Sequence, residues 1–245
     1  MNQLSPAPRW IAQRPIAHRG YHDLSADRPE NSLAAIMAAA EAGFAIECDL
    51  QMSSTGEPVV FHDPTLKRMT NRSGLVRELS PAELAKIHLL DTDQVIETLA
   101  SILRLVDGQV PIILELKGNR GEDAGLVPGV ADCLRAYPGE VAVMSFDHWL
   151  CAQFRKLMPQ VPRGLTAQGN DRTYDGHIAA MRDYDLQFVS YKVQDVDCRF
   201  VRDMRALGLP VITWTVKDEQ ARKWTKDHAD QMTFEGFDPR DLVHG

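Results

Sequence analysis

The chain has 245 residues, a length that fits one large domain. Its hydrophobic and charged fractions, 44% and 25%, are ordinary for a globular protein, and a formal net charge of -7 excludes a broad nucleic-acid-binding surface. Residues 1–13 contain no apolar core of signal-peptide length, and no run is long enough to span a membrane. We therefore expect a cytoplasmic protein with no nucleic-acid partner and no stable membrane insertion. A homo-oligomer is compatible with the sequence.

Apolar runs alternate with helical patterns along most of the chain. Short continuous apolar runs are typical of buried parallel strands, and strands that alternate with helices indicate a parallel sheet. The expected strands are Pro15–His18, Phe44–Gln51, Pro58–His62, Pro111–Lys117, Val141–Phe146, Arg163–Ala167, Gln187–Lys192 and Pro210–Val216. The expected helices are Asn31–Ala42, Val95–Val106, Leu126–Ala136, His148–Leu157, Tyr174–Asp183, Arg199–Leu207 and Glu219–His228.

Eight strands in a chain of this length predict an α/β fold, a (β/α)8 TIM-type barrel. The alternative, an open doubly wound sheet, usually has a glycine-rich phosphate turn after its first strand, and here only Gly20 follows. Two stretches interrupt the alternation. The stretch 64–94 is too long for a plain loop and is expected to form a small insertion over the barrel mouth, after the third strand, within a single domain of residues 1–245. A ninth short run, Asp230–Glu235, is expected to pair beside the last main strand.

Acidic residues end two of the expected strands. Glu47 and Asp49 share a face because strand side chains alternate, and Cys48 points the other way. Glu115 and Lys117 share a face by the same argument. In α/β barrels the carboxyl ends of the strands meet around the active site. Three carboxylates there would form a hard oxygen site suited to Mg2+ or Ca2+. The alternative is a set of strand-end carboxylates paired with arginines.

Two histidines, His18 and His62, also end expected strands. Imidazole titrates near neutrality, so one histidine can take a proton from a nucleophile while the other gives one to a leaving oxygen. Arg19 can hold phosphate oxygens in a bidentate way, and Lys117 can supply a second positive charge. Structural histidines and solvated cations are the alternative. Taken together, these residues predict a site for a divalent metal and a phosphate.

The chain resembles the glycerophosphodiester phosphodiesterases, a branch of the barrel phosphodiesterases that are similar to phosphatidylinositol-specific phospholipase C. The resemblance runs from His18 to about Val216 and is most specific in the first hundred residues. The matching segments are His18-Arg19-Gly20, Pro29-Glu30-Asn31-Ser32, Glu47-Cys48-Asp49, Gly56 to Asp63, Leu66 to Thr70, Glu115-Leu116-Lys117, Ser145-Phe146-Asp147 and Trp214-Thr215-Val216.

This resemblance implies a metal-dependent hydrolase that cleaves small-molecule glycerophosphodiesters to an alcohol and glycerol 3-phosphate. It implies that one divalent cation, Mg2+ or Ca2+, is bound and that two histidines provide acid–base catalysis. The implied roles are metal ligand for Glu47, Asp49 and Glu115, acid–base catalyst for His18 and His62, phosphate contact for Arg19 and Lys117, a position near the substrate for Glu30, and an apolar wall for Phe146 and Trp214. Which histidine is the base stays open; His18 is the working choice.

The chain departs from the family's pattern near its C-terminus. The family usually closes with an apolar strand that ends in Thr-Asp before a proline, whereas residues 232–239 read MTFEGFDP. A second departure is Ile96-Glu97-Thr98-Leu99, where the family usually has a Pro-Thr-Leu-like helix entry. The departure at residues 232–239 leaves the alcohol group of the substrate open. The alternatives are a lysophospholipase D or sphingomyelinase D-like activity on the same fold, and a non-catalytic barrel that binds a phosphate ligand.

Overall fold

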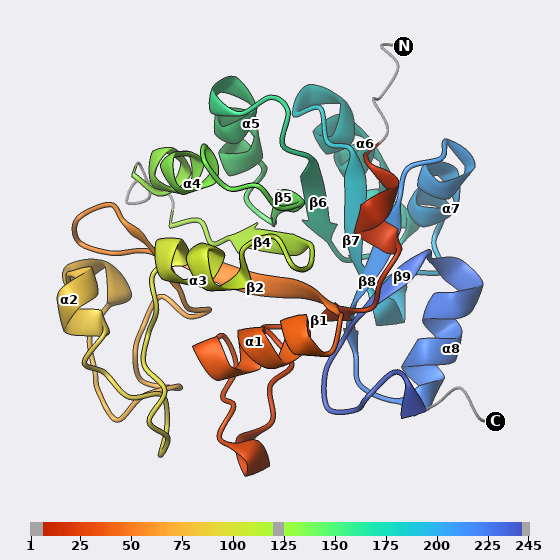
Figure 1. The fold of residues 1–245 in the computed structure, drawn as a ribbon. Coiled ribbons are helices and arrows are strands. Elements are labelled where there is room, and N and C mark those ends of the chain that lie inside the picture. The colour runs from red at the N-terminus through yellow and green to blue at the C-terminus, as the bar shows by residue number, and fades with distance from the viewer. Residues whose placement is uncertain (1–6, 120–124, 242–245) are drawn as a thin grey trace.

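The computed structural model describes residues 7–119 and 125–241, and its central feature is a closed barrel of eight parallel strands (Figure 1). The barrel strands are β1 (Ile16–Ala17), β2 (Ala45–Met52), β4 (Ile112–Leu116), β5 (Val141–Ser145), β6 (Arg163–Ala167), β7 (Phe188–Lys192), β8 (Val211–Val216) and β9 (Gln231–Phe234). Because β1 pairs with both β2 and β9, the sheet closes on itself. The predicted TIM-type barrel is confirmed.

The structure corrects which apolar runs form the barrel. Strand β3 (Pro58–Val60) was expected in the barrel, but it pairs antiparallel with β2 and lies outside the ring. The run expected as an accessory ninth strand supplies β9, the eighth member of the barrel. Only residues 53–57 connect β2 to β3. Such a short connection suits a hairpin, since a parallel pair needs a crossover of a dozen or more residues.

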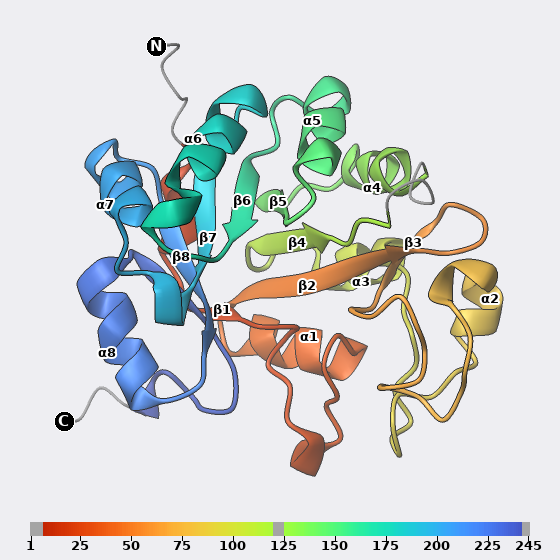
Figure 2. The ribbon, with the colours of Figure 1, turned by 180° about the vertical axis from the view of Figure 1, so that it is seen from behind.

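The helices lie outside the sheet (Figures 1 and 2). They are α1 (Leu33–Glu41), α2 (Pro81–Leu84), α3 (Leu99–Val106), α4 (Leu126–Leu134), α5 (His148–Leu157), α6 (Tyr174–Asp183), α7 (Arg199–Ala206) and α8 (Glu219–His228). Side-chain caps set several of their starts. Ser32 accepts a hydrogen bond from the Ala35 N–H at the start of α1. Thr98 does the same for Ser101, so α3 begins at Leu99, later than the expected 95.

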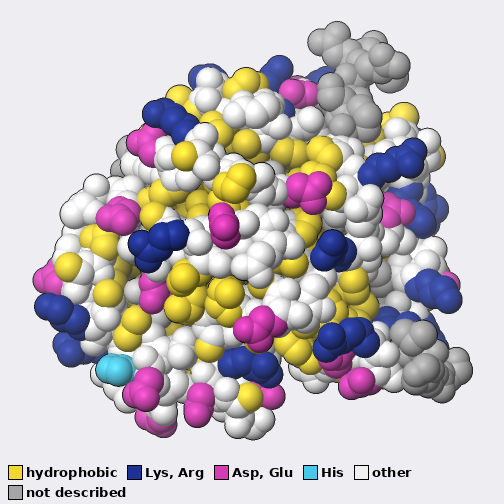
Figure 3. All heavy atoms as spheres, in the orientation of Figure 1, with side chains coloured by type: hydrophobic (Ala, Val, Ile, Leu, Met, Phe, Trp, Pro, Cys, Tyr) yellow, Lys and Arg dark blue, Asp and Glu magenta, His cyan; other side chains and the backbone are white. Residues whose placement is uncertain are grey.

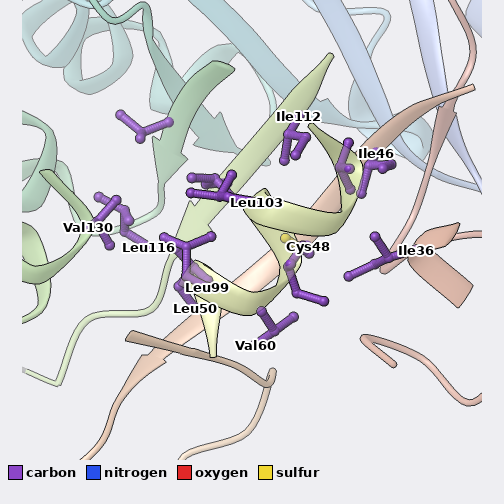
Figure 4. Packing of buried hydrophobic residues seen from close by; sticks show 14 of the residues in the cluster. Ile36, Ile46, Cys48, Leu50, Val60, Leu99, Leu103, Ile112, Leu116 and Val130 are labelled. Atoms are coloured by element: carbon purple, nitrogen blue, oxygen red, sulfur yellow. The ribbon is translucent and has the colours of Figure 1, made fainter. Parts of the chain in front are cut away.

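Apolar side chains separate the sheet from its helices. Figure 4 shows Cys48 and Leu50 of β2 beside Leu103 of α3 and Ile36 of α1, all buried in the same cluster. Cys48 therefore faces the helices, as the strand alternation predicts. Glu47 and Asp49 lie on the opposite face of β2, which faces the barrel interior.

A second apolar cluster fills the barrel interior below the mouth. It contains Ile113, Phe188 and Ile212 from three barrel strands. Ile11, from the 3-10 turn η1 (Arg9–Ala12) that precedes β1, packs into the same cluster. Because apolar side chains occupy the amino-terminal end of the barrel interior, its polar side chains lie toward the carboxyl ends of the strands.

The segment between β3 and α3 has its own small apolar cluster, which includes Phe61, Leu66 and Leu84. This segment, which contains α2, lies to one side of the barrel (Figure 2). Lys, Arg, Asp and Glu side chains are interspersed over the face shown in Figure 3. Across the described ranges, no helix has both the length and the apolar character needed to cross a bilayer.

Candidate active site

Three acidic side chains meet at the carboxyl end of the barrel. Glu47 and Asp49 lie on β2, and Glu115 lies on β4 in register with Asp49. All three are buried, and each offers a carboxylate oxygen within 4.8 Å of the other two. The structure thus brings together the three residues that the sequence analysis proposes as metal ligands. We call them the carboxylate cluster.

Two cations contact the carboxylate cluster. The Nζ of Lys117 lies 2.9 Å from Asp49 Oδ1 and 2.5 Å from Glu115 Oε1. Arg19 donates its backbone N–H to Glu47 Oε2 at 2.9 Å and places its Nε 3.2 Å from Asp49 Oδ2. Burial disfavours the charged form of Asp49, but Lys117 and Arg19 outweigh it and hold the pKa of Asp49 well below its usual range.

The cluster carries more negative charge than its neighbours compensate. Burial, reinforced by the charges of Asp49 and Glu115, raises the pKa of Glu47 well above its usual value. Burial also raises the pKa of Glu115 to about 7, against the opposing charge of Lys117. Glu47 Oε1 is buried without a hydrogen-bond partner. Three carboxylates against two cations, with one unpartnered oxygen, fit a hard divalent cation such as Mg2+ or Ca2+.

His18 follows β1 and points one ring nitrogen at an acidic residue from the other end of the chain. Its Nδ1 lies 2.5 Å from Oε2 of Glu235, which directly follows β9. Its Nε2 lies 4.0 Å from Glu47 Oε2, on the side of the carboxylate cluster. Burial lowers the pKa of His18, although the hydrogen bond to Glu235 works against this. A neutral ring that donates Nδ1–H to Glu235 has a free lone pair on Nε2.

His62 reaches the same cavity from outside the barrel. It follows β3, and its carbonyl accepts a hydrogen bond from Gln51 of β2 at 2.9 Å. Its Nδ1 lies 2.6 Å from Asp63 Oδ1. Burial lowers the pKa of His62, and the nearby charge of Asp49 opposes that shift. The expected origin of His62 on a barrel strand is therefore wrong, but the residue does reach the site.

Glu30 is engaged by two arginines. Its Oε1 accepts from Arg19 and from Arg68, both at 2.7 Å, and its Oε2 accepts from Arg68 at 2.9 Å. Arg68 also donates to both oxygens of Asp63, at 2.7 and 3.1 Å. Glu30 and Arg68 thus link Arg19 to the carboxylate that holds His62. Glu30 thus contacts two arginines and is not among the residues that line the cavity, and its expected position near the substrate stays a prediction.

A cavity of about 100 Å³ opens among these side chains. His18, His62, Arg19, Lys117 and the carboxylate cluster residues Glu47 and Glu115 line its polar part. Phe146 and Trp214 line another part, with ring centroids 5.4 Å apart in an edge-to-face arrangement. Trp214 also donates its indole N–H to the Ser190 carbonyl at 3.1 Å. The two rings therefore lie at the cavity, and the apolar wall that the family resemblance implies for them stays a prediction.

Four residues of the site were assigned no role from the sequence: Glu235, Asp63, Arg68 and Asn31. Asn31 hydrogen-bonds Asp49 through both its amide nitrogen and its amide oxygen. A usable signal existed for Glu235, because it ends the run 230–235 as the other site residues end their strands. Asn31 lies in the matching segment Pro29-Glu30-Asn31-Ser32, but nothing in that segment indicates its contact with Asp49.

Acid–base groups beside cations and a hard-metal site suit the hydrolysis of phosphate esters. At the mouth of a TIM barrel, this combination defines the class of barrel phosphodiesterases. Residues 18–234 match the model of the Glycerophosphoryl diester phosphodiesterase family, and the chain belongs to this family. It is therefore a phosphodiesterase, a hydrolase.

Known proteins agree with this assignment. The glycerophosphodiester phosphodiesterase of Caldanaerobacter subterraneus subsp. tengcongensis is 27% identical over 241 residues, which cover 94% of this chain and 96% of that protein. A solved phosphodiesterase of Oleispira antarctica, in complex with the product sn-glycerol-3-phosphate, has a TM-score of 0.81 at 25% identity and covers 92% of this chain and 93% of its own. A glycerophosphodiester phosphodiesterase of Thermotoga maritima, with a TM-score of 0.72 at 24% identity over 89% of this chain and 92% of its own, shares the fold.

Proposed function

We propose that this phosphodiesterase hydrolyses water-soluble glycerophosphodiesters to an alcohol and glycerol 3-phosphate, with one divalent cation and two histidines. The observation that carries the proposal is the convergence of two imidazole–carboxylate pairs on one small cavity beside the buried carboxylate cluster. The product bound in the Oleispira antarctica structure supports the same substrate class.

Glu47, Asp49 and Glu115 would hold the cation. When bound, Mg2+ or Ca2+ supplies positive charge that polarises phosphoryl oxygens. The charges of the site support this assignment. Among the carboxylate cluster and the two cations that contact it, Arg19 and Lys117, one negative charge is left over. A divalent ion would change this to one positive charge, and a phosphodiester with one negative charge would then balance these groups.

His18 acts as the general base in this proposal. With Nδ1–H donated to Glu235, its Nε2 lone pair faces the cavity and can accept a proton from the nucleophile. The lowered pKa of His18 keeps the ring unprotonated near neutral pH. Glu235 is thus a positioning residue that fixes the tautomer of His18 and stabilises the imidazolium formed in the reaction.

His62 acts as the general acid and protonates the leaving alkoxide. Its Nδ1 is held by Asp63, and this hydrogen bond and the charge of Asp49 raise the pKa of His62 against the larger lowering by burial. The negative charge of a bound phosphodiester would favour the protonated ring further. Asp63 is held in turn by Arg68, which also binds Glu30. The nucleophile is either water or a neighbouring hydroxyl of the glycerol group. A cyclic intermediate would exchange the roles of the two histidines in the second step, by microscopic reversibility.

Arg19 and Lys117 would contact the phosphate, since both line the cavity. The apolar wall consists of only the two rings of Phe146 and Trp214, and this small extent favours a small substrate over a lipid. Among the exposed large hydrophobic side chains of the described residues, Phe146 is the one that lines this cavity. A lysophospholipase would need a broader apolar surface to meet a lipid interface.

A substrate panel tests the proposal. The purified protein is stripped with a chelator and assayed for glycerol 3-phosphate release from glycerophosphocholine, before and after addition of Mg2+, Ca2+ or Mn2+. Lysophosphatidylcholine serves as the lipid comparison, with choline release as its readout. We expect turnover of glycerophosphocholine only after metal is restored. Turnover without metal, or of the lipid alone, contradicts the proposal. Ligand uptake in a calorimetric titration without product identifies a non-catalytic barrel.

A further inference from the structure

A second group of metal-ligating atoms lies beside the carboxylate cluster, where the barrel closes. Glu235 Oε2 is 2.5 Å from His18 Nδ1 and 3.5 Å from His22 Nε2, and the three atoms all lie within 4.8 Å of one another. Tetrahedral coordination with bonds of about 2.0–2.1 Å requires ligand atoms about 3.3 Å apart. The two separations to Glu235 lie on either side of that value, and the two histidine nitrogens lie within 4.8 Å of each other.

The backbone fixes these three residues in place. Strands β1 and β9 pair in parallel, and the backbone N–H of His18 donates to the Phe234 carbonyl at 2.9 Å, so His18 and Glu235 leave their strands side by side. His22 returns to them because the loop after β1 bends at Arg19 and Gly20, with φ values of 55° and 78°. The side chains of His18, His22 and Glu235 are 15%, 23% and 18% exposed, so a dissolved ion can reach them.

We propose that His18, His22 and Glu235 form a second site, one that binds a transition-metal ion such as Zn2+ and inhibits the enzyme. Two imidazoles and one carboxylate suit Zn2+, Ni2+ or Cu2+, whereas carboxylate and water ligands suit Mg2+ and Ca2+. The two sites therefore prefer different ions. Lys217 contacts Oε1 of Glu235 at 2.5 Å, which leaves Oε2 to the two histidines.

Inhibition follows from the proton on His18. A neutral imidazole carries one ring proton, and the free enzyme keeps it on Nδ1, hydrogen-bonded to Glu235. An ion on Nδ1 requires that proton to sit on Nε2, exchanged through solvent. Nε2 then donates a hydrogen bond and has no lone pair for the nucleophile's proton. This consequence rests on the proposed base role of His18, whereas the binding of the ion does not.

Binding and inhibition are measured separately, on the full chain with Mg2+ in large excess to occupy the carboxylate cluster. Zn2+ binding is followed by calorimetry, and Co2+ is used as a spectroscopic probe because its visible absorption bands become much more intense in a four-coordinate site than in water. Inhibition by Zn2+ is followed as loss of glycerophosphocholine turnover. His22→Gln is the test variant and His88→Gln, an exposed histidine in the segment between β3 and α3, is the matched control.

Wild type and His88→Gln are expected to bind one Zn2+ under these conditions, with inhibition at the same concentrations. Without Zn2+, the turnover of His22→Gln should stay within about twofold of wild type. This variant should need at least tenfold more Zn2+ for both binding and inhibition. Equal Zn2+ binding by His22→Gln and wild type overturns the proposed site. Binding that depends on His22 but leaves turnover unchanged supports the site and rejects the base role of His18. If the enzyme fails to turn over this substrate, the Co2+ spectrum still decides whether the site exists.

Discussion

Asn31 holds Asp49 at two points: its Nδ2 donates to Asp49 Oδ2 at 2.9 Å, and its Oδ1 accepts the Asp49 backbone N–H at 3.1 Å. Asn31 is buried just before α1 and has a left-handed backbone with φ of 59°. Asparagine is among the residues that tolerate this conformation. One residue therefore satisfies both a local backbone requirement and the orientation of a proposed metal ligand.

Replacing Asn31 should weaken metal binding. We expect Asn31→Gly to lower the Mg2+ affinity about 10- to 100-fold, as loss of a group that orients a metal ligand typically does. Glycine keeps the left-handed backbone, so this variant removes only the amide. Asn31→Ala adds backbone strain and should lose thermal stability as well. Calorimetric Mg2+ titration and thermal melts separate the two effects. Wild-type affinity in Asn31→Gly would show that Asp49 needs no such support.

Glu235→Gln should reduce kcat by at least about tenfold, because the neutral amide no longer favours the Nδ1–H tautomer of His18 or stabilises its charged form. KM and the Mg2+ affinity should stay near wild type, since Glu235 is neither a proposed Mg2+ ligand nor a proposed substrate contact. Glu235→Asp, which restores the charge on a shorter side chain, should recover part of the loss. Steady-state kinetics check this. An unchanged kcat in Glu235→Gln would remove Glu235 from the reaction.

Metal affinity should rise with pH. A cation must displace the protons of its ligands, and the pKa of Glu115 in the metal-free protein is about 7. Below that value Glu115 is mostly protonated, so binding at pH 6 should be at least about tenfold weaker than at pH 8. The raised pKa of Glu47 acts in the same direction. Mg2+ titrations across this range check the sign, and an affinity that is flat or falls with pH would contradict it.

Gly20 should be intolerant of a side chain. Its φ is 78°, and a Cβ there would lie 2.7 Å from the carbonyl carbon and 2.9 Å from the Cβ of Ala35. Gly56 has a similar φ of 82° but open space around it. We expect Gly56→Ala to lower the free energy of unfolding by about 1 kcal/mol, for the backbone alone. Gly20→Ala should lower it by about 3 kcal/mol, since overpacking is added. Urea unfolding measures both losses. Equal losses would show that Ala35 shifts away from the added Cβ with no further loss of stability.

The barrel and the convergence of Glu47, Asp49 and Glu115 could be predicted from the sequence because both depend on local patterns, whereas the roles of the site residues stay predictions. Alternation along β2 separates Glu47 and Asp49 from Cys48, and an apolar run marks each strand. The same patterns are silent about pairing direction, which is why β3 was placed in the barrel and β9 beside it. Contacts between distant segments, such as His18 with Glu235 or Asn31 with Asp49, depend on register between strands and on loop conformation. A list of apolar runs contains neither.

The turnover of glycerophosphocholine by Glu47→Gln at saturating Mg2+ tests whether the carboxylate cluster and the histidines work as one site. Glutamine preserves the size of the buried side chain, and a circular dichroism spectrum confirms that the variant is folded. His62→Ala is measured beside it. The proposed mechanism predicts that each change lowers turnover by about 10²- to 10⁴-fold. Near-wild-type turnover in both variants would contradict it.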